Sequence, residues 1–490
     1  MTRAARMAII MSIFAVAIRL IGINQPFEDK WSWRQSDVAA IARNYSQAGF
    51  HFACPQIDWA GNSGGYVGTE FPILPFVAAI CYKIFGVHEW IGRIQAVIFF
   101  AISLPFFFLL VRDHLGKLAA VWALLFYSLA PLGIMASRCF MPDTPSLALS
   151  IIGLYFFDRW VAHEKSAAAF VASAVCISLS ILIKATSVLV VAPLVCLAFQ
   201  RVNLSAFRHF RLWVFAAIAL VPSLIWYWHA YQVSLHFYPH HFFGAGGVKV
   251  MSPGWYWKIV KEILTSELTP ILVVLAAVGF VIARSTELRP RLRLFDWWLG
   301  AMILFIVVVG YGNRHPWYQL PLVPIAAVFA GIACACISER IPAPPARLAA
   351  AISLVTLYGL LAFGSVNVFY RPLAGPLRNA GLELNRITPS NALIAVADNG
   401  DPTVLYYAAR KGWHFLEKEG IYYGDPPDGR QAVTNLEQLR AMGANYVAFT
   451  SNTAWWLDLY PELSRYVDAN SALVAKTSQF TIYLFNPKSE

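Results

Sequence analysis

Long apolar runs, separated by short polar segments, occupy most of the first 370 residues of the chain. A run of about 20 apolar residues crosses a bilayer as a helix, so the pattern predicts about eleven transmembrane helices. The predicted spans are 7–24, 90–111, 118–136, 145–160, 166–183, 187–200, 212–229, 269–284, 295–312, 319–337 and 347–368. The expected fold class is a polytopic α-helical membrane protein.

One further apolar run, residues 71–86, is not counted among the transmembrane spans. It is short and contains Pro72, Pro75 and Lys83. If it crossed the membrane, every later loop would change sides. Runs of this length more often lie on the bilayer or partly in it than span it. We therefore predict an interfacial or re-entrant helix here.

The pattern changes after about residue 370, where no long apolar run remains. Short apolar runs predict strands at 393–397, 445–449 and 480–485, and helices are expected at 403–411 and 431–442. We therefore predict a transmembrane domain at 1–370 and a small α/β domain outside the membrane at 371–490. Asn399-Gly400-Asp401-Pro402 predicts a tight turn into a helix; it is a weak indication of a phosphate site and is better explained as a strand-to-helix connection.

Composition narrows the class further. Hydrophobic residues make up 58% of the chain and charged residues only 13%, against about 25% charged in a soluble protein. The formal charge of +11 comes from Lys and Arg clusters between apolar runs. Clusters in that position set topology and are not a nucleic-acid-binding face, so no nucleic-acid partner is expected.

The basic clusters also predict the orientation. Arg3 and Arg6 precede the first span, and no small-residue cleavage pattern follows it, which favours a retained signal-anchor with a cytoplasmic N-terminus. Later clusters then fall on the cytoplasmic side. The loops expected on the periplasmic side of a bacterial inner membrane are 25–89, 137–144, 230–268 and 313–318, together with the C-terminal domain.

Three acidic residues, Asp37, Glu70 and Asp143, fall at this outer boundary, and Arg138 lies near the last of them. Their position suggests chemistry on a charged substrate that arrives through lipid. Transfer of a sugar from a polyprenyl phosphate needs a carboxylate that takes the proton of the acceptor and cations that hold the departing phosphate. Asp37 suits the first role. Candidates for the second are Arg138, Lys184, Arg314 and His315.

Each of these residues also has a simpler explanation. Asp37 lies on an amphipathic stretch, 32–50, where a solvated carboxylate is common. Glu70 could cap the interfacial helix, and Asp143 could be an N-cap near Pro145. Lys184, at the end of a span, either faces an anion or snorkels to the interface. Lys249 follows a glycine-rich segment in a loop whose aromatic residues suit either a sugar or the lipid interface.

The segment order and several short motifs resemble the GT-C glycosyltransferases, especially the bacterial protein-mannosyltransferase and aminoarabinose-transferase branch. The resemblance rests on an aspartate in a long first loop, Glu70-Phe71-Pro72 before an interfacial helix, and Arg138-x-x-Met141-Pro142-Asp143 after the third span. It extends over roughly residues 7–370. It implies a membrane enzyme that uses a polyprenyl-phosphate sugar, such as an undecaprenyl-phosphate sugar, as its donor.

The resemblance also assigns roles. The proposed catalytic aspartate of the family corresponds to Asp37, and its other acidic positions correspond to Glu70 and Asp143. In the aminoarabinose branch a lysine follows the glutamate and helps to bind phosphate, but Phe71 stands there in this chain, so other cations must take that role. The segment 313–321, which contains Arg314, His315 and Tyr318, resembles the family's basic-and-tyrosine segment, where the carrier phosphate is expected.

The expected function is transfer of a sugar, with inversion, from polyprenyl phosphate to a periplasmic lipid A, polysaccharide or protein acceptor. The alternative is a transporter or flippase for lipid-linked saccharides, which would favour charges within the spans and an internal repeat. The sequence leaves open the sugar, the acceptor, the oligomeric state, the participation of a divalent metal and a disulfide between Cys54 and Cys139. No cofactor is assigned.

Overall fold

The computed structural model describes residues 2–162, 166–243, 247–284 and 289–487. The chain divides into two compact units. The first, called the helical unit, consists of Met1–Ile23, Arg93–Trp226 and Ala245–Phe369. The second, called the mixed unit, consists of Asn24–Gly92, Tyr227–Gly244 and Tyr370–Glu490. The long first loop and the C-terminal segment, which are far apart in sequence, therefore belong to the same unit.

The helical unit is built from helices and short helical turns. Its elements are α1 (Arg3–Leu20), α4 (Glu89–Leu115), α5 (Lys117–Leu129), α6 (Pro131–Ala136), α7 (Asp143–Ala162), α8 (Ala167–Ile183), η1 (Ala185–Val190), α9 (Val191–Val202), η2 (Asn203–Arg208), α10 (Phe210–His236), α11 (Pro253–Glu262), η3 (Ile263–Glu267), α12 (Pro270–Arg284), α13 (Arg289–Val309), η4 (Pro316–Gln319), α14 (Leu322–Arg340), α15 (Pro344–Asn367) and η5 (Val368–Tyr370). One end of each of α4, α10 and η5 belongs to the mixed unit.

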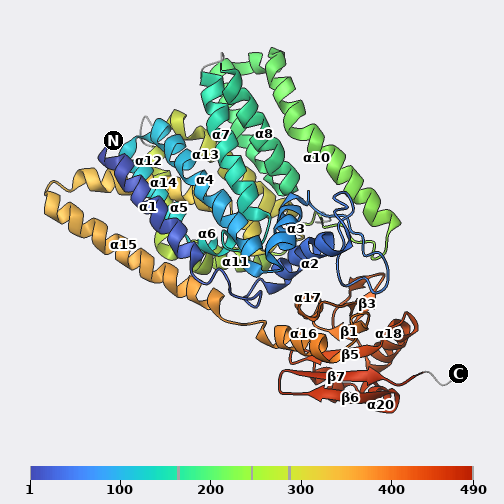
Figure 1. Ribbon diagram of the computed structural model, residues 1–490. Coiled ribbons are helices and arrows are strands. Elements are labelled where there is room, and N and C mark those ends of the chain that lie inside the picture. Colours follow the sequence, from blue (N-terminus) through green and yellow to red (C-terminus); the bar gives the residue numbers. More distant parts are fainter. Residues whose placement is uncertain (1, 163–165, 244–246, 285–288, 488–490) are drawn as a thin grey trace. The chain divides into compact units, whose positions relative to one another are not determined.

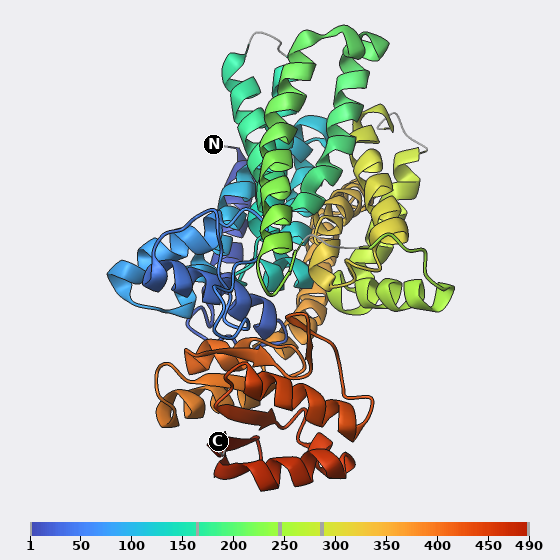
Figure 2. The ribbon, with the colours of Figure 1, turned by 90° about the vertical axis from the view of Figure 1, so that its right-hand side faces the viewer.

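Small residues set the closest helix contacts in this unit. α7 packs along α8, and α14 packs between α5 and α12 (Figure 1, Figure 2). A Cβ atom on Gly279 would lie 1.8 Å from the carbonyl oxygen of Phe329, and one on Gly331 would lie 2.6 Å from that of Ala119. Because apolar side chains gain little by leaving lipid for a helix interface, membrane helices associate through such close backbone approach.

Four helical segments in the described part of the chain are long and apolar enough to cross a membrane: Glu89–Leu115, Phe210–His236, Leu322–Arg340 and Pro344–Ile387. A pair bent by 106°, Pro253–Glu267 with Pro270–Arg284, adds a fifth if it is counted as one span. Every other predicted span coincides with shorter or more charged helices. The span expected at 118–136, for example, is interrupted at Ala130 before Pro131. A total of eleven spans stays a prediction.

The mixed unit combines helices with a five-stranded sheet of order β2-β1-β5-β7-β6 (Figure 1). The strands β2, β1 and β5 are parallel to one another, and β7 pairs antiparallel with both β5 and β6. The elements are α2 (Ser32–Ala48), α3 (Ile73–Phe85), α16 (Gly375–Ile387), β1 (Leu393–Ala397), α17 (Thr403–Ala408), β2 (Lys411–His414), β3 (Glu417–Lys418), β4 (Ile421–Tyr422), α18 (Gly429–Ala441), β5 (Tyr446–Thr450), α19 (Trp455–Leu459), α20 (Pro461–Asn470), β6 (Ser471–Lys476) and β7 (Phe480–Phe485).

The predicted strands and helices of this unit are confirmed, with shifted boundaries in three of them. β5 is Tyr446–Thr450 where 445–449 was expected, and α18 is Gly429–Ala441 where 431–442 was expected. The helix expected at 403–411 ends at Ala408, because Ala409 adopts a left-handed conformation (φ 50°), and Lys411 already begins β2. Alternate residues of β1 pack on opposite sides of the sheet, as the period of a strand requires. Ile394 and Val396 join one apolar cluster, and Ala395 and Ala397 join the other.

The first loop is an integral part of this core. Ile41, Ile57 and Trp59 belong to the same apolar cluster as Ile394. The loop backbone also pairs with the edge strand β2, since Gly412 donates to the carbonyl of Asp58 at 3.0 Å and accepts from Gly61 at 2.7 Å. An uncovered edge strand invites aggregation, and the loop protects this one.

Candidate functional site

Asp37 lies on α2, almost fully enclosed by the mixed unit. Only 3% of its surface is exposed. The indole nitrogen of Trp59 donates to its Oδ1 at 3.1 Å, and the Arg34 guanidinium lies 3.7 Å from its Oδ2. The solvated carboxylate that the amphipathic pattern allowed is therefore excluded. The pattern misled because the polar face of α2, like its apolar face, packs against other segments of this unit.

Glu70 is held beside the same arginine. Its Oε1 accepts from Arg34 at 2.6 Å, and its Oε2 accepts from the Thr69 hydroxyl at 2.9 Å. The described N-terminus of α3 has no side-chain cap, so the capping role considered for Glu70 is not seen. Arg34 thus bridges the two acidic residues, and its guanidinium also lies 5.1 Å from the ring centre of Phe243.

Burial changes the acidity of Asp37. Loss of solvent raises the pKa of this carboxyl to about 6, although Arg34, the Trp59 hydrogen bond and His414 each act to lower it. A carboxylate with a pKa near neutrality is a stronger base than an exposed one and remains mostly ionised at pH 7. The surroundings therefore suit Asp37 to proton abstraction.

The C-terminal segment contributes residues that the sequence analysis did not identify. Nδ1 of His414 lies 2.8 Å from Oδ1 of Asp398, and both side chains are buried. Burial alone would lower the pKa of His414, but Asp398, with Asp401 and Asp37, outweighs that effect and raises it. The Trp59 ring contacts both His414 and His241, with each ring centre 5.3 Å away.

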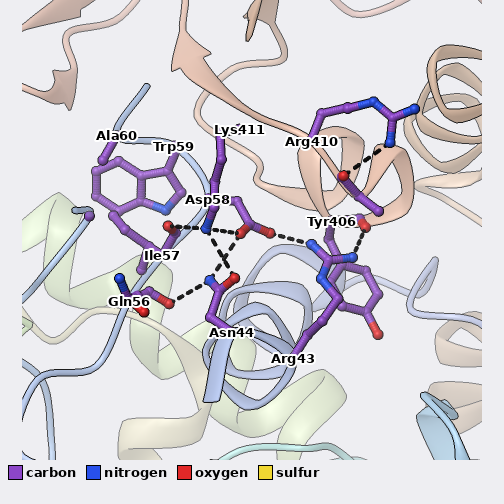
Figure 3. Close-up of polar contacts among 12 residues, drawn as sticks. Arg43, Asn44, Gln56, Ile57, Asp58, Trp59, Ala60, Tyr406, Arg410 and Lys411 are labelled. Atoms are coloured by element: carbon purple, nitrogen blue, oxygen red, sulfur yellow. Dashed lines mark hydrogen bonds and ion pairs between the residues drawn. The ribbon is translucent and has the colours of Figure 1, made fainter. Parts of the chain in front are cut away.

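A buried ionic network attaches the first loop to the C-terminal segment (Figure 3). Asp58 accepts from Arg43 of α2 at 2.5 Å, from Lys411 of β2 at 2.8 Å and from Asn44 at 3.0 Å. Arg43 also donates to the carbonyl of Tyr406. Because Trp59 directly follows Asp58, this network fixes the segment that supplies the hydrogen bond to Asp37.

The helical unit holds a second group of predicted residues. Nζ of Lys184 lies 2.8 Å from Oδ1 of Asp143 and 4.4 Å from the ring centre of Tyr318. Lys184 lies at the break between α8 and η1, and Asp143 is the first residue of α7. All three line one pocket together with Trp317. Lys184 therefore faces a carboxylate and an aromatic ring, which differs from a lysine that snorkels to the membrane interface.

The other predicted phosphate ligands do not line this pocket. Arg138 is fully buried and donates to the carbonyl of Gly22 at 3.0 Å. His315 stacks on Trp317 with ring centres 4.5 Å apart, Arg314 is exposed, and Lys249 lies 5.1 Å from the ring centre of Tyr311. Of the cations proposed from sequence, the structure brings only Lys184 together with Asp143 and Tyr318 in the described part of this pocket.

The remaining open points concern metals and thiols. Within the described residues, no three His, Cys, Asp or Glu side chains are grouped so that they could hold a metal ion. Cys54 and Cys139 are free thiols, and the other five cysteines are also free. Cys139 is buried and its thiol lies 3.1 Å from the carbonyl of Met135. The two thiols belong to different units, Cys54 to the mixed unit and Cys139 to the helical unit.

The chain is similar to one known protein family and to several solved structures. Residues 69–228 match the family described as dolichyl-phosphate-mannose-protein mannosyltransferase. No curated protein matches the chain in sequence. The solved structure of ArnT from Cupriavidus metallidurans in the apo state is similar, with a TM-score of 0.70, 15% identity and coverage of 98% of each chain. Its undecaprenyl-phosphate-bound structure has a TM-score of 0.68, 14% identity and 97% coverage of each chain.

An archaeal structure shows the same likeness. The oligosaccharyltransferase of Archaeoglobus fulgidus has a TM-score of 0.60 and 13% identity, over 99% of this chain and 75% of that one. The structural similarity covers nearly the whole chain and establishes the fold, and the family match covers Glu70, Asp143 and Lys184. Both findings agree with the resemblance indicated by the motifs: the chain shares the fold of ArnT and of the archaeal oligosaccharyltransferase, and residues 69–228 match the mannosyltransferase family.

Proposed function

We propose that the protein transfers a sugar from a polyprenyl-phosphate donor to a hydroxyl or amine of a periplasmic acceptor, with Asp37 as the base. The observation that carries this proposal is the enclosed Asp37 carboxylate, oriented by Trp59 and Arg34 and with its pKa raised to about 6. The donor class is supported by the structures of similar proteins, which were solved with undecaprenyl phosphate and with dolichol phosphate.

The reaction balances as a single displacement. The acceptor oxygen or nitrogen forms a bond to the anomeric carbon as the bond from that carbon to the phosphate oxygen breaks. Asp37 takes the acceptor proton, and the phosphate leaves with the bonding electron pair. One displacement inverts the anomeric configuration. Because phosphate is already a weak base, protonation of the leaving group by a second carboxyl is less necessary than in glycoside hydrolysis.

We assign phosphate binding to the pocket of the helical unit. An ammonium group has three donors, so Lys184 can contact Asp143 and still donate to a phosphate oxygen. Asp143 then acts as a positioning residue that holds the Lys184 side chain towards the pocket. Tyr318 supplies the aromatic face below the ammonium and a hydroxyl that can donate to phosphate.

Two variants test these assignments with purified protein and a synthetic polyprenyl-phosphate sugar. Asp37→Asn keeps the side-chain size but removes the proton acceptor, so turnover should fall by ~10²–10⁴ while donor binding persists. Lys184→Ala should instead weaken donor binding, because its contact is made in the ground state and the transition state alike.

Exposed positions supply the controls. Asp113→Asn and Lys117→Ala make the same chemical changes on exposed side chains. Both variants should keep turnover and donor affinity near the wild-type values. Near-normal turnover in a folded Asp37→Asn variant would remove Asp37 from catalysis. Unchanged donor affinity in Lys184→Ala would remove the phosphate assignment.

A further inference from the structure

A separate pocket opens at one end of the sheet in the mixed unit. It has a volume of about 330 Å³ and is lined by Trp33, Asp398, Asn399, Asp401 and Asn452, among others. Small-molecule sites typically measure about 300–1,000 Å³. The pocket is therefore large enough to hold part of a ligand.

Its polar side chains follow neighbouring parallel strands. Asp398 comes directly after β1, and Asn452 comes two residues after β5, which pairs with β1 in parallel. His414, which contacts Asp398, is the last residue of β2, the other parallel neighbour of β1. Ligands of α/β sheets bind outside the carboxyl ends of their strands. The pocket thus occupies the usual position for a binding site.

One buried oxygen in this pocket has no internal partner. Asp398 is fully buried, and its Oδ1 accepts from the backbone of Gly400 at 3.0 Å and contacts His414. Its Oδ2 has no hydrogen-bond partner among the described residues. Leaving a buried polar atom unsatisfied is costly, so such atoms often mark a place where a ligand binds.

The neighbouring turn is built to present further polar groups. Asn399 and Gly400 both have positive φ angles, 57° and 75°. At Gly400 a Cβ atom would also lie 2.7 Å from the Tyr422 ring, so glycine is required there. The turn brings Asn399 and Asp401 to the same pocket as Asp398. The tight turn expected from the sequence therefore forms, and its side chains line a cavity.

The chemistry of the lining selects one class of ligand. Two carboxylates and two amides can accept from and donate to several hydroxyl groups at once, and Trp33 adds an aromatic surface. No Lys or Arg lines the described pocket, so a phosphate group would meet carboxylates without a compensating cation. These features favour a neutral or amino saccharide and disfavour the phosphorylated donor.

The pocket is connected to Asp37 through α2. The Ser32 hydroxyl donates to Asp401 at 3.1 Å, and the hydroxyl oxygens of Ser36 and Thr403 lie 3.1 Å apart. Asp37 follows Ser36 on the same helix. We propose that this pocket is a saccharide subsite, which binds a sugar unit of the acceptor beyond the hydroxyl or amine that reacts. This inference rests on the proposed glycosyltransferase function.

Saccharide binding can be measured without the donor. The full-length protein in detergent is mixed with methyl glucoside, methyl glucosaminide, methyl N-acetylglucosaminide and glucose 6-phosphate, and binding is followed by saturation-transfer NMR. We expect at least one of the three methyl glycosides to bind and the phosphate to bind more weakly. Asp401→Asn and Asn452→Ala should each weaken that binding by roughly tenfold, the effect of losing one hydrogen bond to a ligand. Asp468→Asn, on the exposed side of α20, should not.

The outcomes separate this inference from the proposed function. Binding that is lost in the pocket variants and kept in Asp37→Asn supports the subsite, even if the protein proves inactive with polyprenyl-phosphate sugars. Three results overturn it: no binding of any methyl glycoside, preferential binding of the phosphate, or unchanged binding in both pocket variants. In the transfer assay, the same variants should raise KM for a saccharide acceptor and leave kcat within about twofold.

Discussion

Trp59 connects the proposed base with the C-terminal segment. Its indole nitrogen donates to Asp37, and its ring contacts two histidines that differ in charge state. His414 is favoured in its charged form by Asp398, whereas burial lowers the pKa of His241 to about 4 and keeps that ring neutral. Trp59 therefore stabilises the ionised form of Asp37 from within an otherwise desolvated site.

This arrangement predicts a specific pH dependence. A base acts only when deprotonated, so kcat/KM should fall as the pH drops through about 6, the pKa of Asp37. Trp59→Phe removes a hydrogen bond that favours the ionised form, which raises the pKa of Asp37 further. The acidic limb should then move to higher pH, and activity near pH 7 should decrease.

The measurement is the pH profile of kcat/KM for both enzymes. Trp228→Phe, at an exposed position of α10, is the matched control. Its kcat/KM should fall at the same acidic pH as that of the wild-type enzyme. A Trp59→Phe profile that falls uniformly, with its acidic limb unmoved, would show that Trp59 has only a structural role.

Residues could be predicted from sequence where their position along the chain was informative. Asp37, Asp143 and Lys184 flank apolar segments, which identified them as groups at a membrane boundary. Asp398 and His414 gave no such signal, because they meet the first loop only through contacts between segments far apart in sequence, such as the 363-residue separation between Arg43 and Tyr406. Trp59 is only 22 residues from Asp37, but its position in the sequence does not reveal the hydrogen bond between them. The position of Asp398 at the end of a predicted strand was the one available indication.

At the scale of elements, α2 and β2 are joined by buried charges. Burial alone would raise the pKa of Asp58, but Lys411, Arg43 and the hydrogen bonds from Lys411 and Asn44 hold it below its usual value. A group with a lowered pKa in the folded state contributes stability above its unfolded pKa of about 3.9, and that stability is lost as the pH falls. The attachment of the first loop should thus weaken in acid.

Removing one partner from this network should be strongly destabilising. Arg43→Met leaves the Asp58 carboxylate with less compensation, and loss of one member of a buried ion pair costs about 3–5 kcal/mol. Adding Asp58→Asn removes the stranded charge, so the double variant should recover part of the loss. Thermal unfolding of the purified proteins, followed by near-UV circular dichroism, measures both effects. Asp468→Asn is the exposed control, and strictly additive losses would contradict the proposed coupling.

The elements themselves were predictable to different degrees. Strand periodicity identified β1, β5 and β7, since buried strands carry continuous apolar residues. β2 was missed because Lys411-Gly412-Trp413-His414 is neither apolar throughout nor alternating. The break at Ala130-Pro131 interrupts a span that appears continuous in hydropathy, because a window average does not detect a single residue that leaves the helical conformation. The break at Lys184, in contrast, falls between the spans expected at 166–183 and 187–200.

For the whole molecule, the distribution of basic residues predicts which segments share a side of the membrane. Arg112 and Lys117, and Arg201, Arg208 and Arg211, are expected in the cytoplasm because Lys and Arg are retained there. The mixed unit adds an independent constraint. Asp58 and Lys411 form an ion pair, so the first loop and the C-terminal segment must lie on the same side.

Reporter fusions test both statements in whole cells. We expect fusions after residues 60 and 400 to give alkaline phosphatase activity, which requires the periplasm, and fusions after 114 and 205 to give fluorescent GFP, which indicates the cytoplasm. The first two should agree because a hydrogen-bonded pair cannot form across a bilayer, and the fusion at 114 should differ because Glu89–Leu115 is long and apolar enough to cross once. Opposite reports at 60 and 400 would contradict the shared unit, whereas the same report at 60 and 114 would show that residues 71–86 also cross the membrane.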